Sequence, residues 1–417
     1  MIGIQKGNKL TADGPSRKQR LQLAVILGSI TTIGPLSIDM YLPALPTLVA
    51  DFGTTAALVQ LSLTFFLLGL ASGQLVAGPL SDVYGRRRPL LIGMFIYAVS
   101  SVLCAFSPSI GLLIGLRFIQ GLAGSVGVVV SRAAVRDLYS GSELTKFFSL
   151  LMIVNGLGPI LAPVIGGQLL RVTTWQGIFL VLFAAGIIFC LTILLRLPET
   201  LPKERRSKSG LKGTLLTFRV LLGNRKFMGY ALSQGFVTAS MFAYISGSSF
   251  VLQNIFAVTP QVYSLIFAMN GIGIIITGQI AGRLAGKVSE TKLLLSGLLL
   301  CTMGGILLLL TILVGGGLIP ILICLFAVVS SVGIVGATSF SLAMQDQGET
   351  AGSASALIGL IPLLLGSCVA PLVGLGGVES ALPMAIVIAW HVLEFSPFCL
   401  ICCLLDGEKP APSSLSL

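Results

Sequence analysis

Long apolar runs alternate with short polar turns along almost the whole of this 417-residue chain. A helix that crosses a membrane needs about 20 consecutive apolar residues, and most of the runs have that length. The pattern therefore predicts an all-α polytopic membrane protein with twelve transmembrane helices. They are expected near residues 21–42, 57–80, 89–106, 110–131, 146–170, 176–197, 227–252, 261–284, 291–313, 317–341, 350–375 and 380–404. The first run is too long for the core of a cleaved signal peptide, so we expect it to remain as the first helix.

The only long polar stretch, residues 198–226, divides the predicted helices into two groups of six. It is either a disordered linker or, as we favour, a linker with an amphipathic portion on the inner face of the membrane. The predicted organisation is a cytoplasmic N-terminal tail (1–20), a first six-helix bundle (21–197), the linker (198–226), a second six-helix bundle (227–404) and a cytoplasmic C-terminal tail (405–417).

Short internal matches indicate that the second group of helices repeats the first. Residues 158–166 and 366–374 share the pattern G-x-x-x-A-P-x-[IV]-G, and Ser-Val-Gly-[VI]-Val occurs at 125–129 and 331–335. The matches come in the same order at nearly the same offset, which makes chance a poor explanation. A duplicated six-helix unit that forms two pseudo-symmetric bundles is typical of transporters whose substrate site lies between the halves.

The distribution of charge predicts how the chain is oriented. Only 10% of the residues are charged, against roughly 25% in soluble domains. Lys and Arg concentrate in alternate loops, with Arg171 as the exception. By the positive-inside rule this places both termini in the cytoplasm of a multi-pass protein of the cell membrane. The net charge of +11 therefore reflects topology, and we expect no nucleic-acid partner.

Four stretches carry a resemblance to a known family. Residues 78–87 (GPLSDVYGRR) resemble the signature loop between helices two and three of the major facilitator superfamily. Residues 37–46 (SIDMYLPALP), 116–127 (LRFIQGLAGSVG) and 158–167 (GPILAPVIGG) resemble the helix-one, helix-four and helix-five motifs of its twelve-span drug/proton antiporters, with Ala162 where the usual pattern has glycine. With the RDLYSGSE-type loop that follows the fourth helix, the chain is similar to the bicyclomycin/chloramphenicol-resistance (Bcr/CflA) branch.

This resemblance implies a rocking transporter in which the loop after the second helix holds one state closed. In that fold Asp82 would accept from backbone N–H groups at the start of the eleventh helix, where an anion is favoured. Arg86 would pair with an acid after the fourth helix, for which Asp137 is the candidate. The alternative is a loop that only sets topology. The candidate latch residues are Gly78, Asp82, Gly85, Arg86, Arg87 and Asp137.

Two ionisable side chains inside the predicted helices, Asp39 and Arg117, are candidates for proton coupling. An arginine in the middle of a membrane costs about 2.5–3.5 kcal/mol on insertion scales, so a partner or a water-filled cavity is expected. Helices one and four run in opposite directions, and at about 1.5 Å per residue the two side chains reach similar depths.

We hypothesise that they pair, directly or through water. Asp39 would bind and release the proton, and Arg117 would keep the carboxylate charged until the two separate. The alternative has Asp39 always ionised at the interface and Arg117 snorkelling toward it. The matching positions of the second half lie near Ile245 and Ile323, with no acid or base close by, so we assign coupling to the first half.

Two further sets of residues complete the candidate site. Polar or aromatic candidates for contacts in the substrate pocket are Tyr41, Gln120, Asn155, Gln234, Tyr244 and Asn270. Small or kinking residues of the antiporter-type helix, which would pack closely on a partner helix, are Gly158, Pro159, Ala162, Pro163, Gly166 and Gly167.

Together these features predict a proton-coupled efflux transporter that exports small amphipathic compounds such as antibiotics by alternating access. The chain has no ATP-binding motif, no metal-ligand spacing and no catalytic set within the spans, so we expect no enzyme, no metal and no cofactor beyond the proton gradient. The alternative is a uniporter or symporter for a sugar, an amino acid or another metabolite. We expect a monomer. The substrate and the roles of His391, Glu394, Cys402 and Cys403 stay open.

Overall fold

The computed structural model describes most of the predicted helices. The described residues are 17–138, 156–202, 212–345 and 351–390, together with Glu204, Arg206 and Gln347. Within them the chain is built from helices and carries no named strand. Ten of these helices are long and apolar enough to cross a membrane, and a shorter apolar helix covers Gly156–Leu169. The predicted fifth and twelfth helices extend into residues outside the described ranges.

The described chain forms two compact units. The first comprises residues up to Gly213 with Ser249–Gly271 and Gly377–Glu379, and the second comprises Thr214–Ser248, Ile272–Gly376 and the residues from Ser380 onward. The switch at Gly213 falls inside the predicted linker. Ser249–Gly271 differs from the predicted division, because this segment contacts the first unit: the Gln253 amide donates to the Pro43 carbonyl at 3.2 Å.

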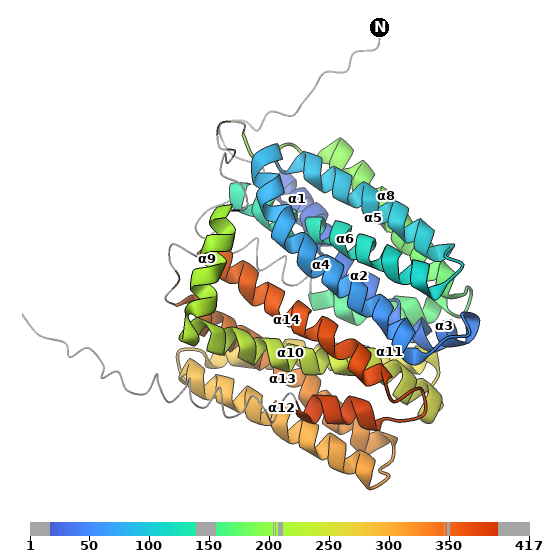
Figure 1. The fold of residues 1–417 in the computed structure, drawn as a ribbon. Coiled ribbons are helices and arrows are strands. Elements are labelled where there is room, and N and C mark those ends of the chain that lie inside the picture. Colours follow the sequence, from blue (N-terminus) through green and yellow to red (C-terminus); the bar gives the residue numbers. More distant parts are fainter. Residues whose placement is uncertain are drawn as a thin grey trace, which may run out of the picture. The chain divides into compact units, whose positions relative to one another are not determined.

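The helices of the first unit begin and end close to the predicted boundaries. They are α1 (Arg17–Thr31), α2 (Ile33–Asp39), the 3₁₀ turn η1 (Leu42–Ala44), α3 (Leu45–Asp51), α4 (Ala56–Tyr84), α5 (Arg87–Ala105), α6 (Ile110–Leu138) and α8 (Trp175–Arg196). Helix α4 packs against α6, and α5 packs against both α6 and α8 (Figure 1).

The helices that follow Gly213 continue the pattern of long spans joined by short turns; most of them belong to the second unit, but Ser249–Gly271 belongs to the first. Helix α9 (Lys212–Gly223) lies in the predicted linker, and from Thr214 on it belongs to the second unit. It is followed by α10 (Arg225–Phe250), a π-helical turn η3 (Val251–Ile255), α11 (Pro260–Leu284), α12 (Glu290–Leu313), α13 (Leu318–Met344) and α14 (Ala351–Gly374). Helices α12 and α13 pack side by side.

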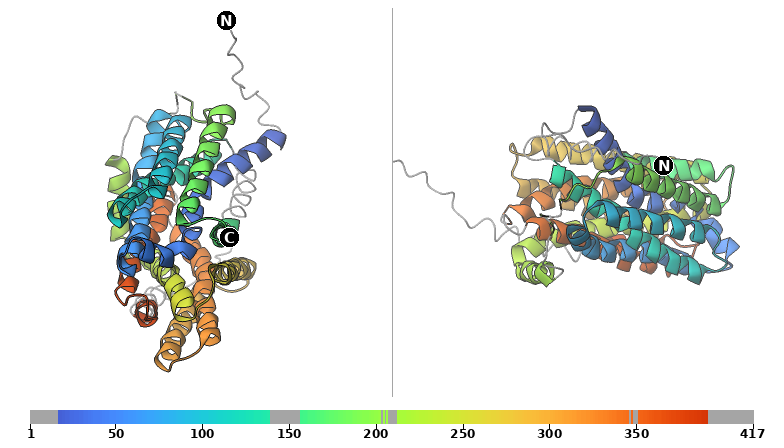
Figure 2. Two further views of the ribbon diagram at one scale, coloured as in Figure 1. Left: turned by 90° about the vertical axis from the view of Figure 1, so that its right-hand side faces the viewer. Right: turned by 90° about the horizontal axis from the view of Figure 1, so that it is seen from above.

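The first span is broken into pieces, whereas the sequence predicted one continuous helix at 21–42. The hydroxyls of Thr31 and Thr32 bond back to carbonyls three residues earlier, each at 2.7 Å, and helix α2 starts again at Ile33. Pro43 and Pro46 lack an N–H and open η1 and α3, which carry the span on to Asp51. Helix α1, the darkest blue helix, contacts α6 and α8, and its N-terminal end projects beyond the neighbouring helices in Figure 2.

Glycines bring α4 and α6 into unusually close contact. A Cβ added to Gly69 would lie 2.1 Å from the Phe118 carbonyl oxygen, and one added to Gly121 would lie 2.1 Å from the Phe66 carbonyl oxygen. Small residues allow such approach between membrane helices, where packing drives association. This crossing fixes the height of Arg117, one turn before Gly121 on α6.

We expect Gly121→Ala to destabilise the protein, because the added methyl group has no space and the two backbones must separate. Overpacking of this kind costs about 1–3 kcal/mol, which a thermal melt in detergent would detect. Gly115→Ala is the matched control on the same helix, since a Cβ there meets nothing within 4 Å. Equal melting temperatures for the two variants would contradict the prediction.

Candidate functional site

A fully buried guanidinium, that of Arg117, and the side chains around it form the first part of the site, called here the Arg117 centre. Arg117, on α6, has 0% of its surface exposed. Its Nη2 donates to the Ser37 carbonyl at 3.0 Å and its Nη1 donates to Gln120 Oε1 at 2.6 Å. Its Nε has no hydrogen-bond partner among the described residues. Arg117 is therefore held inward by short bonds, which excludes the snorkelling alternative for this structure.

Aromatic rings surround the same guanidinium. Its central carbon lies 4.2 Å from the ring centre of Phe66, 5.0 Å from that of Tyr41 and 5.7 Å from that of Phe179. The faces of aromatic rings attract cations, more strongly when water is excluded. The rings thus offset part of the cost of burying the charge.

The Ser37 carbonyl is free to bind Arg117 because helix α2 ends two residues later. In a continuing helix this carbonyl would accept from the N–H of Tyr41, but that N–H bonds to the Ile38 carbonyl at 3.2 Å instead. The last carbonyls of a helix need outside donors, and the negative end of the helix dipole favours a cation. The break in the first span therefore creates the acceptor for Arg117.

A second layer of hydrogen bonds fixes the partners of Arg117. The Gln120 amide donates to Ser101 Oγ at 2.7 Å, and that hydroxyl donates to the Tyr97 carbonyl at 2.7 Å. The Tyr97 hydroxyl and Ser37 Oγ are 2.6 Å apart and share a hydrogen bond. Sequence reasoning missed Tyr97 and Ser101. Their spacing of four on one helix, which places both on one face, was the available signal.

Asp39 is buried near this centre but does not form the predicted direct pair. It is 5% exposed at the end of α2, and no ion pair joins it to Arg117 within the described part of the chain. The sequence predicted a pair that forms directly or through water; the direct form is absent from this structure, and the pair through water stays a prediction. Asp39 and Arg117 were expected at similar depths, but depth does not fix the direction of a side chain. Residues two apart on a helix differ by about 200° in direction, so the Asp39 side chain points to roughly the opposite side of α2 from the Ser37 side chain.

The two pocket candidates of the first span and α6 belong to this centre. Tyr41 and Gln120 are fully buried, and the Tyr41 hydroxyl lies 3.0 Å from Ser62 Oγ. They support Arg117 and do not face an open pocket. The other candidates lie elsewhere: Gln234, whose Oε1 has no partner among the described residues, buried Tyr244 on α10, buried Asn270 on α11, and Asn155, which is outside the described residues.

The antiporter-type helix packs against the broken first span. A Cβ on Gly166 would lie 2.2 Å from the Met40 carbonyl oxygen, next to Asp39, and one on Gly158 would lie 3.3 Å from Pro35. Ala162, between them, is fully buried. The remaining small or kinking residues of the set, Pro159, Pro163 and Gly167, lie on the same helix, and the Gly167 carbonyl accepts from the Gln261 amide at 2.9 Å.

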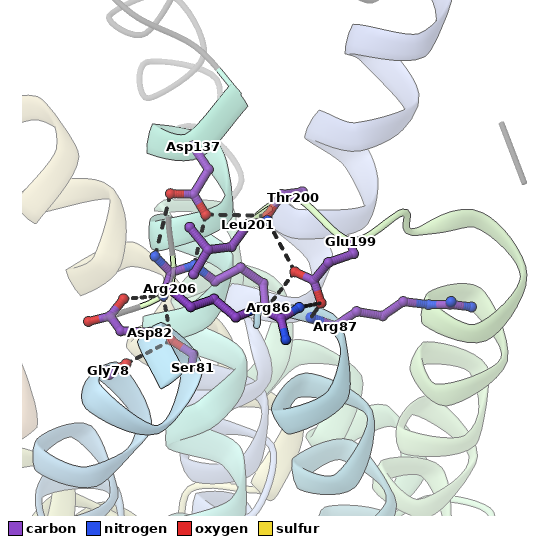
Figure 3. Close-up of polar contacts among 10 residues, drawn as sticks. All are labelled: Gly78, Ser81, Asp82, Arg86, Arg87, Asp137, Glu199, Thr200, Leu201 and Arg206. Atoms are coloured by element: carbon purple, nitrogen blue, oxygen red, sulfur yellow. Dashed lines mark hydrogen bonds and ion pairs between the residues drawn. The ribbon is translucent and has the colours of Figure 1, made fainter. Parts of the chain in front are cut away.

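The loop between α4 and α5 forms a separate charged cluster around Arg86 (Figure 3). Its Nε donates to Asp137 Oδ2 at 2.7 Å, and its Nη1 donates to Asp82 Oδ1 at 2.5 Å and to Ser81 Oγ at 2.7 Å. Ser81 Oγ in turn donates to the Gly78 carbonyl at 2.8 Å. The structure thus brings Arg86 and Asp137 together from two different helices.

Arg86 stays charged despite its burial. Burial by itself lowers the pKa of the guanidinium, but the hydrogen bonds and charges of Asp137 and Asp82 outweigh it, and the net pKa is raised. Only 8% of the side chain is exposed, whereas Asp82 is 47% exposed. The predicted contact of Asp82 with the start of the eleventh helix would join the two units and stays a prediction.

Glu199, which sequence reasoning missed, completes this cluster. Its carboxylate accepts from the backbone N–H groups of Arg86 at 2.8 Å and Arg87 at 3.3 Å, where α5 begins. It also lies 3.7 Å from the Arg206 guanidinium. Gly85, at φ +87°, makes room, since a Cβ there would lie 2.5 Å from Glu199 Oε2. The available signal was an acid directly after the sixth predicted helix, within reach of a helix N-terminus. Arg87 itself donates through Nη2 to the Leu194 carbonyl at 2.6 Å.

Comparison with known proteins places this geometry in a family. The profile of the Major Facilitator Superfamily matches residues 27–371. The chain is 47% identical over 372 residues to the uncharacterized MFS-type transporter YdgK of Bacillus subtilis (strain 168), covering 89% of this chain and 92% of the relative. It is 30% identical over 368 residues to the bicyclomycin resistance protein homolog of Haemophilus influenzae, covering 88% and 92%. It is 32% identical over 293 residues to the chloramphenicol resistance protein of Pseudomonas aeruginosa, covering 69% and 68%.

Solved structures share the fold at low sequence identity. The inward-facing, unoccupied structure of a bacterial homolog to the human lysosomal transporter Spinster has a TM-score of 0.76 and 15% identity, covering 96% of this chain and 100% of that chain. The D-xylose-proton symporter has a TM-score of 0.70 and 16% identity with the same coverage. The predicted all-α fold is confirmed, and the chain is a transporter and not an enzyme. It belongs to the major facilitator superfamily, within the bicyclomycin/chloramphenicol-resistance (Bcr/CflA) branch.

Proposed function

We propose that this protein exports small amphipathic compounds, antibiotics among them, in exchange for protons. The observation that carries the proposal is Arg117 with its surroundings: a fully buried cation whose Nε has no partner among the described residues, held at a helix break two residues from a buried acid. Such groups are costly inside a membrane and are usually kept for function. Relatives named for bicyclomycin and chloramphenicol resistance support drugs as the cargo.

In the proposed cycle Asp39 is the residue that carries the proton. Its carboxylate takes up a proton from the outer side as cargo leaves, and it releases the proton to the cytoplasm after the carrier has turned inward. Arg117 is a fixed positive charge that favours the ionised carboxylate. Its unfilled Nε–H is the donor that a carboxylate or a cargo carbonyl would reach in another state of the carrier.

The proposed orientation places both termini and the α4–α5 loop in the cytoplasm, because Lys and Arg concentrate in the loops on that side. We also propose a monomer that uses the proton gradient and no cofactor. In this arrangement the cluster of Arg86, Asp82, Asp137 and Glu199 acts as a cytoplasmic latch, which ties the start of α5 to the end of α6 and to the linker.

We expect Arg86→Ala to reduce both transport and thermal stability, because it leaves Asp137 and Asp82 without their shared cation. The loss of folding stability should stay below the ~3–5 kcal/mol that removing one partner of a fully buried ion pair costs, because Asp82 is about half exposed. Arg88→Ala removes the same charge from an exposed position two residues further on, in the first turn of α5, and should behave like the parent. A latch role would be refuted if both variants transported equally well.

The proposed function is tested in an efflux-deficient bacterial host that expresses the protein. Growth inhibition by a panel of hydrophobic and amphipathic antibiotics should be weaker than in the empty host, and an uncoupler should remove the difference. Cellular accumulation of the protected compounds should fall in parallel. Raised accumulation of a sugar or amino acid, without protection against any drug, would instead establish a uniporter or symporter for metabolites.

A further inference from the structure

A chain of contacts links the outer end of the first span to the Arg117 centre. Asp51 ends α3, and Trp175 begins α8, 124 residues further along the sequence. The indole Nε1–H donates to Asp51 Oδ2 at 2.8 Å. Trp175 is only 3% exposed, whereas Asp51 is exposed. The indole is thus fixed in the unit and holds a residue at its surface.

Aromatic rings continue from the indole toward the buried charge. Trp175 lies 5.3 Å from Phe52 and meets Phe179, one helical turn later, edge-to-face at 6.1 Å between ring centres. Phe179 lies 5.3 Å from Tyr41, and both of these rings contact the Arg117 guanidinium. The contacts therefore lead from Trp175 to the charge through Phe179 directly and through Phe179 and Tyr41 together.

The first span needs such an outside support because its own backbone does not fix it. Between Asp39 and Leu45 the chain passes from α2 through η1 to α3, each piece only a few residues long. Short helical pieces have little stability of their own. The position of the Ser37 carbonyl and of Asp39 is therefore set by contacts to other helices at both ends of the break.

We propose that Asp51 and Trp175 form a positioning clip, which holds the outer end of the first span so that the Ser37 carbonyl and Tyr41 stay against Arg117. Neither residue touches cargo or the proton. They act through Phe179, Tyr41 and the helix break on the site that binds the proton. The effect on coupling rests on the proposed function, whereas the mechanical clip can be measured without transport.

The mechanical clip is tested by fluorescence, because the chain has only two tryptophans. In a Trp390→Phe background, Trp175 is the single fluorophore. Adding Asp51→Ala should shift its emission to longer wavelength and raise quenching by acrylamide, since the indole loses its partner. Asp51→Asn keeps an acceptor oxygen and should resemble the background variant. Glu379→Ala, which removes another exposed acid, is the matched control and should leave the emission unchanged.

Hydrogen exchange tests whether the clip reaches the helix break. We expect peptides that cover residues 37–48 to exchange at least roughly tenfold faster in Asp51→Ala, because a hydrogen bond to a charged group contributes about that factor to an opening equilibrium. Asp51→Asn should restore most of the protection. Exchange that stays at the parent level, or emission that does not change, would overturn the clip whether or not the protein exports drugs.

The coupling role is tested by the pH profile of drug efflux. Asp51→Ala and Trp175→Phe should each change the ratio of rates at acidic and alkaline external pH, and the double variant should add little to either single change. A purely structural contact would lower the rate equally at every pH, and that result would overturn the coupling role. Absence of efflux by the parent protein would refute the proposed function instead, while fluorescence and exchange still decide the clip.

Discussion

Asp39→Asn should abolish uphill drug efflux driven by a proton gradient. Asparagine has nearly the same shape as aspartate, so the variant should fold and insert at normal levels, but the side chain cannot bind and release a proton. Asp39 is 5% exposed, and it lies between the carbonyl that holds Arg117 and the Met40 carbonyl that packs on Gly166. The other acids of the described first-unit spans, Asp51, Asp82 and Asp137, all lie at or within two residues of a span end.

The measurement separates coupling from binding. Inside-out vesicles would be incubated with a drug that the parent exports. Accumulation of the drug inside the vesicles would be followed with and without an imposed proton gradient. The variant should lose gradient-driven accumulation completely, while exchange of labelled for unlabelled drug without a gradient should persist. Asp51→Asn, at the C-terminal end of the same span, should keep gradient-driven transport. Full gradient-driven accumulation by Asp39→Asn would refute the assignment of the proton to Asp39.

Elements of this protein that depend on local hydrophobicity could be predicted from the sequence. Helix α4 was expected at 57–80 and runs from Ala56 to Tyr84, and α12 was expected at 291–313 and runs from Glu290 to Leu313. Boundaries moved where polar residues continue a helix, as in α6, which passes Arg132 and Arg136 to reach Leu138. Apolar length identifies a span, but it does not say how far the helix extends beyond the membrane.

The contacts that matter for the site depend on backbone groups, which a residue pattern does not reveal. The charge pattern singled out Arg117 and Asp39, and depth suggested that they meet. The partner of Arg117 is instead the Ser37 carbonyl, which is available only because the helix ends at Asp39. Glu199 was missed for the same reason. Its carboxylate accepts hydrogen bonds from backbone N–H groups at the start of α5, and a pattern of side-chain charges does not reveal such partners.

Arg117→Lys should lose most transport even though it keeps the positive charge. The guanidinium satisfies two acceptors on different elements, Ser37 and Gln120, while its central carbon lies over the Phe66 ring at 4.2 Å from the ring centre. A lysine ammonium is a compact point charge that cannot reproduce this fork or stack in the same way. At least one of the two acceptors would lose its donor, and a buried group without a partner costs about 1–3 kcal/mol.

Arg117→Ala should be more damaging to folding than Arg117→Lys, because it leaves both acceptors without donors and opens a cavity among three rings. Arg171→Lys and Arg171→Ala, at an exposed position outside the spans, serve as controls for the two exchanges. Thermal melts and vesicle transport would be measured for all four variants. If Arg117→Lys retained gradient-driven efflux at the parent level, positive charge alone would be sufficient at this site. The hydrogen-bond geometry between α6 and the broken first span would then be dispensable for coupling.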